Sequence, residues 1–262
     1  MSEIGIFEGK RCLILLPHYD DEIFCLPLIS RLHEADISLQ IIWLTNSQGL
    51  NIKIEQKTIT KRMNESEIFI KKITNDHLKL THLGVNRSIA DGYLIYHLRE
   101  IFHFLKSEIN NTKATFLTPL WENGHADHDA SFILGKILED DGNGKHISFP
   151  IYDTNTRWLP YRVMHLKKKE KDLYVKIKLK DKLIVIMAPY YFRSQIKSWV
   201  GLYLPMLTKF IFSNKFFFIE GQKYQELKIG NSRLIRRRAK NDYEKIVNKT
   251  KNYSQENGIV IN

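Results

Sequence analysis

Apolar runs and helical patterns alternate through the first 150 residues of this 262-residue chain. Strands that alternate with helices of this length form βαβ units, in which the strands run parallel and helices cover both faces of the sheet. The pattern therefore predicts an α/β chain with a Rossmann-like three-layer fold and a mostly parallel sheet. The expected strands are 11–17, 37–46, 79–85, 114–120 and 146–152, and the expected helices are 22–35, 56–74, 93–109 and 126–140.

The second half of the chain follows a different pattern. Two apolar stretches within 158–180 flank a Lys-rich turn and predict a hairpin. A long helical pattern covers 181–201, and Pro189 should break or kink it because proline removes a backbone donor and clashes with the preceding turn. An aromatic segment at 210–219 and a polar tail come next. These features indicate a C-terminal hairpin and helix elaboration.

Composition bounds the kind of protein. We expect one domain over 1–262, with a core over about 10–155 and the elaboration over about 156–262. The apolar content of 43% excludes a disordered chain. The N-terminus has no basic region typical of a signal peptide, and no uncharged apolar run is long enough to span a membrane. Cys12 and Cys25 form no disulfide or metal pattern, which favours a reducing, cytoplasmic setting.

The chain carries a net charge of +11. Lysine and arginine concentrate at 167–169 and at 233–251. Such a balance suits nucleic acid, an anionic membrane surface or an anionic substrate, and it also suits a solvated, Lys-rich C-terminal helix. No recognition motif for DNA or RNA accompanies the charge, so we expect no nucleic-acid partner.

An aromatic-rich stretch runs from Lys197 to Phe218 and is punctuated by Lys209 and Lys215. One interpretation is that it packs against the core, as most aromatic stretches of soluble domains do. The other is that it lies on an anionic bilayer, which would make the protein peripheral to the inner face of the membrane. Both interpretations stay open from the sequence.

Two polar clusters follow apolar runs, and both contain His and Asp. The segment 17–22 reads Pro-His-Tyr-Asp-Asp-Glu, and the segment 124–128 reads Gly-His-Ala-Asp-His. The carboxyl ends of strands are the edge at which open α/β sheets bind ligands. Adjacent carboxylates beside an imidazole are costly unless a cation or a substrate uses them. The clusters together predict a metal site with a catalytic carboxylate beside it.

The spacing suggests how the metal ligands divide. His18 and Asp21 can reach one ion from a single strand-end turn, and His128 can supply a third ligand from the start of a helix. Two imidazoles and one carboxylate leave an open position, which is typical of a catalytic site. Zn²⁺ is the default metal for this set, and Fe²⁺ also accepts it.

The remaining polar side chains then have candidate catalytic roles. Asp20 is expected to act as the general base. His125 can stabilise an oxyanion or protonate the leaving nitrogen, and Asp127 can orient an imidazole. Each residue alone has a plainer explanation, since Asp20 and Asp21 could be a helix N-cap pair. The coincidence of both clusters at strand ends favours the site.

Together, the two clusters resemble the PIG-L/LmbE-like family of zinc-dependent N-acetylglucosamine de-N-acetylases. The resemblance extends over about 10–200 and implies a hydrolase that removes acetyl from an N-acetylated sugar conjugate. It assigns zinc, base and oxyanion roles to the same residues, and places Arg62 and Asp91 at positions that hold sugar hydroxyls. Further matching segments are Thr45–Gly49, Arg62 with Glu65, Leu83–Val85, Asp91–Gly92 and Tyr191–Gln195, the last with one inserted residue.

Two positions depart from the family's pattern. Tyr19 stands where a small residue or proline is common, which is expected to narrow the pocket. Asn46-Ser47 replaces a more usual Asp-Gly pair. Both departures concern the substrate rather than the chemistry.

Other classes of protein also fit parts of the pattern. An Fe(II) oxygenase could use His18, Asp20 and His128, but it would leave Asp21 and His125 without a role, and those enzymes use all-β barrels. A non-catalytic glycan-binding protein would need neither Asp20 nor His125. Metal-assisted phosphoester hydrolysis lacks the additional carboxylates of a two-metal site.

Overall fold

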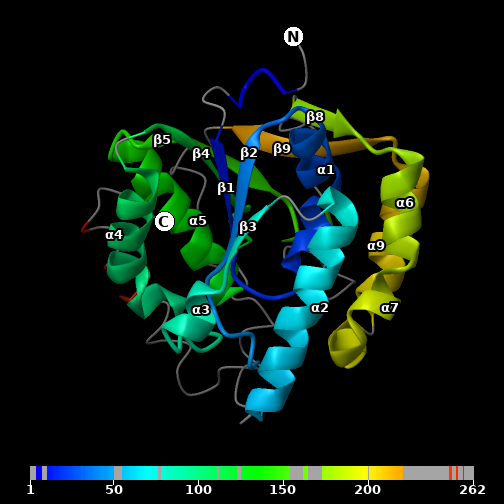
Figure 1. Cartoon of the computed structure of the whole chain (residues 1–262), viewed down its shortest axis with the longest axis horizontal. Helices are drawn as coiled ribbons and strands as arrows, with labels where there is room; N and C mark the ends of the chain where they lie inside the picture. Colours follow the sequence, from blue (N-terminus) through cyan, green and yellow to red (C-terminus); the bar gives the residue numbers. More distant parts are fainter. Residues whose placement is uncertain are drawn as a thin grey trace.

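The computed structural model describes most of the chain, and Figure 1 shows its helices on both sides of a central sheet. The described residues are 4–7, 11–49, 55–75, 78–110, 112–122, 125–153, 162–164, 173–199 and 201–220, with four positions beyond residue 247. Up to residue 149 the elements are β1 (Arg11–Leu16), η1 (Asp21–Cys25), α1 (Leu26–Glu34), β2 (Ser38–Trp43), α2 (Gln56–Thr74), β3 (Lys79–Thr81), α3 (Leu83–Asn86), η2 (Leu94–Tyr96), α4 (Leu98–Ile109), β4 (Ala114–Pro119), α5 (Ala126–Asp140) and β5 (Gly144–Phe149). After residue 149 they are β6 (Tyr152–Asp153), β7 (Arg162–Val163), β8 (Leu173–Lys176), α6 (Leu179–Ile186), α7 (Ala188–Tyr191), η4 (Arg193–Gln195), α8 (Ile196–Trp199), α9 (Tyr203–Phe212) and β9 (Lys215–Glu220).

The described strands form a seven-stranded sheet in the order β3-β2-β1-β4-β5-β9-β8, beside a two-stranded sheet of β6 and β7. The strands from β3 to β5 in that order run parallel, and β9 is antiparallel to both of its neighbours. The predicted three-layer, mostly parallel fold is confirmed. Because the chain builds away from β1 on one side and from β4 on the other, this pair is a topological switch point, where such sheets bind ligands.

Strand β1 shows why the sheet needs helices on both faces. Successive side chains of a strand point to opposite faces. Cys12, Ile14 and Leu16 pack in a core that includes residues of α1 and α2, while Leu13 and Leu15 pack in a second core with residues of α4 and α5. A strand buried on both faces is apolar along its length, which is why it was recognisable in the sequence.

The strand expected at 79–85 ends at Thr81, and the chain continues as α3. Within α3 the backbone of Gly84 lies against the backbone of Thr45. A Cβ placed on Gly84 would stand 2.1 Å from the Thr45 carbonyl carbon. Only glycine permits this approach, and it brings the end of β2 against α3.

The C-terminal half departs from the predicted pairing. The expected hairpin within 158–180 is wrong: β8 pairs with β9, about forty residues later, and β7 pairs with β6. The expected break at Pro189 is confirmed, since α6 ends at Ile186 and the proline stands in the first turn of α7. Lys167–Lys169 and nearly all of 233–251 lie outside the described residues. The division into core and elaboration stays a prediction.

Candidate active site

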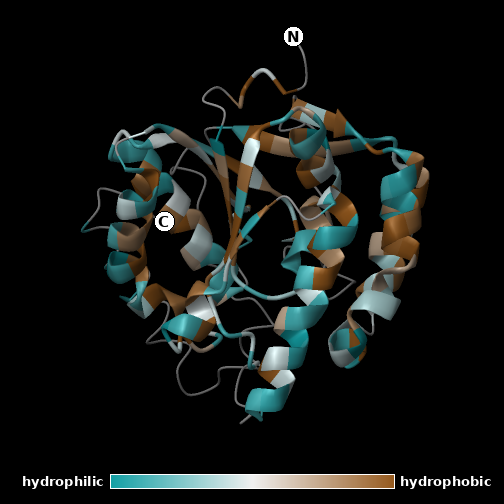
Figure 2. Cartoon of the chain, in the orientation of Figure 1, coloured by the Kyte–Doolittle hydropathy of each residue, from teal (hydrophilic) through white to brown (hydrophobic). Residues whose placement is uncertain are grey.

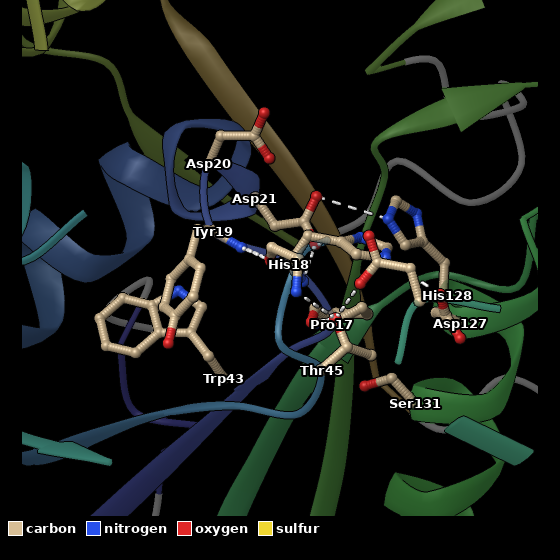
Figure 3. A network of polar contacts seen from close by, with 12 residues as sticks. Pro17, His18, Tyr19, Asp20, Asp21, Trp43, Thr45, Asp127, His128 and Ser131 are labelled. Atoms are coloured by element: carbon tan, nitrogen blue, oxygen red, sulfur yellow. Dashed lines mark hydrogen bonds and ion pairs between the residues drawn. The ribbon is translucent and has the colours of Figure 1, made fainter. Parts of the chain in front are cut away.

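The turn after β1 brings His18 and Asp21 to the switch point. Asp20 has a φ of 103°, a left-handed conformation that Asp adopts more readily than most residues. The backbone N–H of His18 donates to Asp21 Oδ2 at 2.8 Å, which holds these two residues together. In Figure 3 Asp21 is directed toward His128 and a contact joins the two, whereas no contact joins the Asp20 carboxylate to His128. The turn therefore separates the two adjacent carboxylates.

Three side chains from the two clusters converge in this structure. Asp21 Oδ2 lies 3.3 Å from His18 Nδ1, and Asp21 Oδ1 lies 3.4 Å from His128 Nε2. A tetrahedral ion with zinc–ligand bonds of about 2.0–2.1 Å separates its ligand atoms by about 3.4 Å. The donor set suits zinc, and each of the two separations is that of two ligands of one ion, although they involve different oxygens of Asp21.

The outer nitrogen of His128 faces a carboxylate that the sequence pattern did not single out. His128 Nδ1 lies 2.9 Å from Glu122 Oε2, and both side chains are buried. Glu122 Oε1 also accepts the Tyr152 N–H at 2.8 Å, which fixes the carboxylate in place. A carboxylate that accepts the outer N–H directs the inner nitrogen's lone pair toward a metal.

Asp127 contacts the outer nitrogen of His18, as Glu122 contacts the outer nitrogen of His128. Its Oδ2 lies 3.0 Å from His18 Nε2 and accepts the Gly92 N–H at 2.6 Å. Asp127 Oδ1 accepts the Leu94 N–H at 3.2 Å. The side chain is buried, so these contacts orient it firmly. The geometry suits the predicted role of Asp127 in orienting an imidazole.

His125 precedes α5 and lies against both other imidazoles. Its ring stacks on that of His128 with the centroids 4.1 Å apart, and meets the His18 ring edge-on at 4.8 Å. Nitrogens of the three rings lie within 4.8 Å of one another. His125 is therefore a geometric alternative to Asp21 as a third ligand, and Asp21 is the carboxylate that contacts both His18 and His128.

Asp20 is held from the C-terminal part of the chain. Trp199 Nε1, at the end of α8, donates to Asp20 Oδ2 at 2.7 Å. Partial burial and the neighbouring charge of Asp21 raise the pKa of Asp20, and the Trp199 hydrogen bond opposes that shift. A carboxylate with a raised pKa is a stronger base than an exposed one.

The site concentrates negative charge away from water. Burial alone would lower the pKa of His128, but Glu122 and Asp21 together raise it to about 10. Buried carboxylates in such number are costly without compensating positive charge. A bound cation would supply that charge. The buried carboxylates in and around the two clusters are Asp21, Glu22, Asp91, Glu122, Asp127 and Asp129.

The two predicted sugar-binding residues both contact the loop after β2. Asp91 accepts hydrogen bonds from Thr45 Oγ1 at 2.6 Å and from the Gly49 N–H at 2.7 Å. Its Oδ1 lies 4.0 Å from His18 Nε2. Arg62 donates through Nη1 to the Ser47 carbonyl. Both residues thus shape the loop beside the metal ligands, and their contact with sugar hydroxyls stays a prediction.

Tyr19 does not narrow a pocket at the site, and that expectation is wrong. Its side chain is fully buried, with its ring 5.3 Å from that of Trp43 and its hydroxyl 2.9 Å from His82 Nδ1. Figure 3 shows it on the opposite side of the turn from the Asp21–His128 pair. The Tyr19 side chain is therefore part of the core rather than of the site.

Ser194 and Gln195, which are far from the first cluster in the sequence, form hydrogen bonds with α2 and with the turn after β1. The Ser194 N–H donates to Glu65 Oε1 at 2.9 Å, and Gln195 Nε2 donates to the Tyr19 carbonyl at 2.8 Å. These bonds join η4 to α2 and to the loop after β1. They also place the following helix so that Trp199 reaches Asp20.

Comparisons with known proteins identify a family model that matches the segment carrying both clusters. Residues 13–136 match the family model of PIG-L, described as GlcNAc-PI de-N-acetylase. The matching segment contains both clusters, from the strand before His18 to the helix that carries His128. The matching family is one of de-N-acetylases.

The fold of this chain resembles several solved structures at low sequence identity. One is a deacetylase of the teicoplanin biosynthesis pathway, with 10% identity, a TM-score of 0.57, and coverage of 81% of this chain and 99% of that chain. Another is the N,N'-diacetylchitobiose deacetylase of Pyrococcus horikoshii, with 18% identity, a TM-score of 0.55, and coverage of 82% and 84% respectively. A conserved protein of Thermus thermophilus has 18% identity, a TM-score of 0.53, and coverage of 80% and 94%. Among curated proteins, none matches the sequence. At these identities the likenesses show a common fold.

Proposed function

We propose that this protein is a metal-dependent hydrolase that removes the acetyl group from an N-acetylated amino sugar. The substrate would be an N-acetylglucosamine-type conjugate, such as a glycolipid or a precursor of a surface polysaccharide. One observation carries the proposal: Asp21 contacts both His18 and His128, and a further carboxylate contacts the other ring nitrogen of each imidazole. These carboxylates are Asp127 for His18 and Glu122 for His128. This set lies at the switch point, inside the segment that matches a de-N-acetylase family.

His18, Asp21 and His128 would hold the metal, either Zn²⁺ or Fe²⁺. When bound, zinc lowers the pKa of water to about 7 and polarises a carbonyl oxygen. Glu122 and Asp127 would keep the two imidazoles in the tautomer that leaves a lone pair for the ion. The fold thus supplies ligands from two neighbouring strand ends and orienting carboxylates from the same clusters.

Asp20 and His125 would carry the proton and charge movements of amide hydrolysis. Asp20, whose Oδ2 is held by Trp199, would take a proton from the attacking water. The water oxygen bonds to the acetyl carbon, the C–N bond breaks, and the proton passes to the leaving nitrogen, giving acetate and a free amine. His125 would donate to the carbonyl oxygen as negative charge develops there.

The rival functions explain fewer of these residues. A glycan-binding protein has no need of a carboxylate fixed by a distant tryptophan, as Asp20 is. An Fe(II) oxygenase that uses Asp20 as its ligand would leave Asp21 without a role, yet Asp21 is the carboxylate that contacts both imidazoles. Both arguments favour hydrolysis.

Metal removal provides the direct test of this function. After treatment with a chelator, acetate release from an N-acetylglucosamine conjugate should fall to background, and stoichiometric Zn²⁺ should restore it. Acetate and the free amine should appear in equal amounts, because one bond is cleaved. Full acetate release by metal-free protein, or none by zinc-loaded protein across a panel of N-acetylated sugars, would contradict the proposal.

Replacing Glu122 by Gln should weaken metal binding about 10–100-fold, the usual cost of losing an orienting partner. The amide keeps the size of the side chain but removes the charge that polarises His128. A competition titration of zinc against a chromophoric chelator measures the change. Glu67→Gln is a matched control, because Glu67 accepts from His82 at 2.8 Å, and His82 is not one of the proposed metal ligands. Equal zinc affinity in the Glu122 variant and the wild type would remove Glu122 from the site.

A further inference from the structure

Helices α6 and α7 carry a row of large apolar side chains that face water. The row recurs at the spacing of one helix face, which in a buried helix would be the face turned to the core. Its members are Leu179, Leu183, Ile186, Met187 and Tyr190, each between 46% and 72% exposed. Scattered exposed apolar residues are ordinary, but a periodic row indicates a surface that binds something.

Helix α9 carries a second such row beside the first. Leu204 is 67% exposed, Ile211 is 39% exposed and Phe212 is 84% exposed. Helices α6 and α9 are antiparallel neighbours: Tyr203 Oη, at the start of α9, donates to the Ile186 carbonyl at the end of α6, and Lys182 Nζ of α6 donates to the Ile211 carbonyl near the end of α9. Figure 2 shows apolar colouring along this pair of helices at the edge of the molecule. We call the eight exposed side chains of α6, α7 and α9 the apolar face.

The other faces of the aromatic-rich stretch do pack inside the protein. Trp199, Phe210, Phe216 and Phe218 are all buried. Packing against the core therefore explains most of its aromatic residues. It does not explain Phe212, the most exposed of the large apolar side chains among the described residues.

The charged residues of the segment that carries the apolar face are nearly all basic, although Lys178 is paired with Glu34 of α1 at 2.7 Å. Residues 173–219 contain seven lysines and one arginine, but a single carboxylate, Asp181. Asp181 is fully buried and lies 3.5 Å from the buried Arg31, so it neutralises none of the surface charge. Exposed cations next to exposed apolar side chains are the pattern of a segment that lies in the interface of an anionic bilayer.

We propose that the apolar face docks on an anionic lipid bilayer. The apolar side chains would enter the boundary between headgroups and acyl chains, and the flanking lysines would meet lipid phosphates. Attachment would be peripheral, because no helix of the described chain is long and apolar enough to cross a membrane. A symmetric contact with a second copy is disfavoured, since a two-fold interface sets the same patch against itself and would bring lysines against lysines.

The apolar face is connected to the candidate active site. Helix α8 lies between α7 and α9 in the chain, and its Trp199 donates to Asp20. Docking would therefore hold the site close to the bilayer surface. On this ground, and resting on the proposed function, the N-acetylated sugar would be the headgroup of a lipid-linked conjugate.

Co-sedimentation of the full chain with vesicles tests the docking without any turnover. The protein should pellet with phosphatidylcholine vesicles that contain phosphatidylserine, and less with phosphatidylcholine alone, and binding should weaken as salt rises. The double variant Leu183→Glu with Phe212→Glu should bind these vesicles at least about tenfold more weakly. Ile68→Glu, at a side chain 56% exposed on α2, should bind like the wild type. Thermal unfolding of both variants beside the wild type checks that they fold.

Three outcomes would overturn the docking proposal. The first is a wild type that stays in solution with anionic vesicles at low salt, and the second is a double variant that pellets like the wild type. The third is a dimeric wild type that does not pellet and becomes monomeric in the double variant, which would make the apolar face a contact between copies. Because sedimentation needs no substrate, a failure here leaves the deacetylase proposal standing. Absence of acetate release from all sugars would leave the docking result standing in turn.

Discussion

Replacing His128 by Ala should leave the purified protein without stoichiometric zinc and without measurable acetate release. A site with three protein ligands has none to spare, and the loss would also leave the buried Glu122 carboxylate without its imidazole partner. Unpaired buried charge is costly, so the variant should also unfold at a lower temperature than the wild type. Elemental analysis of the purified variant, with acetate release measured on the same sample, gives both readouts.

His125→Ala is the matched comparison for that variant. It removes an imidazole that stacks on His128 at 4.1 Å, but in our account it removes no ligand. Zinc should stay bound, and turnover should slow about 10²–10³-fold, the usual cost of one group that stabilises an oxyanion. If His125→Ala loses zinc as His128→Ala does, and Asp21→Asn retains it, the three-histidine set is the true ligand set.

Asp20→Asn should keep the metal while kcat falls by about two to four decades, the range for lost general-base catalysis. Asparagine has nearly the same shape, and its carbonyl oxygen can still accept from Trp199, so the fold of the turn should survive. Acetate release by the zinc-loaded variant is the measurement. Trp199→Phe, which removes the hydrogen bond that fixes the carboxylate and part of a buried ring but leaves the carboxylate itself, should cost less. Wild-type turnover in zinc-loaded Asp20→Asn would show that another group takes the proton.

The parallel half of the fold was predictable because its signals are local. Helices α2 and α5 have the bounds expected from the sequence. In each of them the apolar residues recur at helical spacing, and a strand precedes and follows the helix in the chain. The two clusters were expected to meet because both follow parallel strands. The structure brings them together for a reason that the sequence does not show, which is that β1 and β4 are neighbours.

What escaped prediction depends on contacts between distant parts of the chain. Strand β8 pairs with β9, which lies about forty residues later in the chain. The sequence of β8 alone could not distinguish this pairing from a local hairpin. Trp199 reaches Asp20 across most of the chain, with no motif to mark it. Glu122 did carry a usable signal, because it follows β4 closely and precedes the second cluster. The burial of Tyr19 in the core is a further feature that composition alone does not reveal.

The central claim is that His18, Asp21 and His128 together hold the catalytic metal. Crystal diffraction from the zinc-loaded protein, measured on both sides of the zinc absorption edge, tests it most directly. We expect one anomalous peak at bonding distance, about 2.0–2.2 Å, from His18 Nδ1, an Asp21 oxygen and His128 Nε2. A peak bonded to His125 in place of Asp21, or one located between His18, Asp91 and Asp127, would contradict the account.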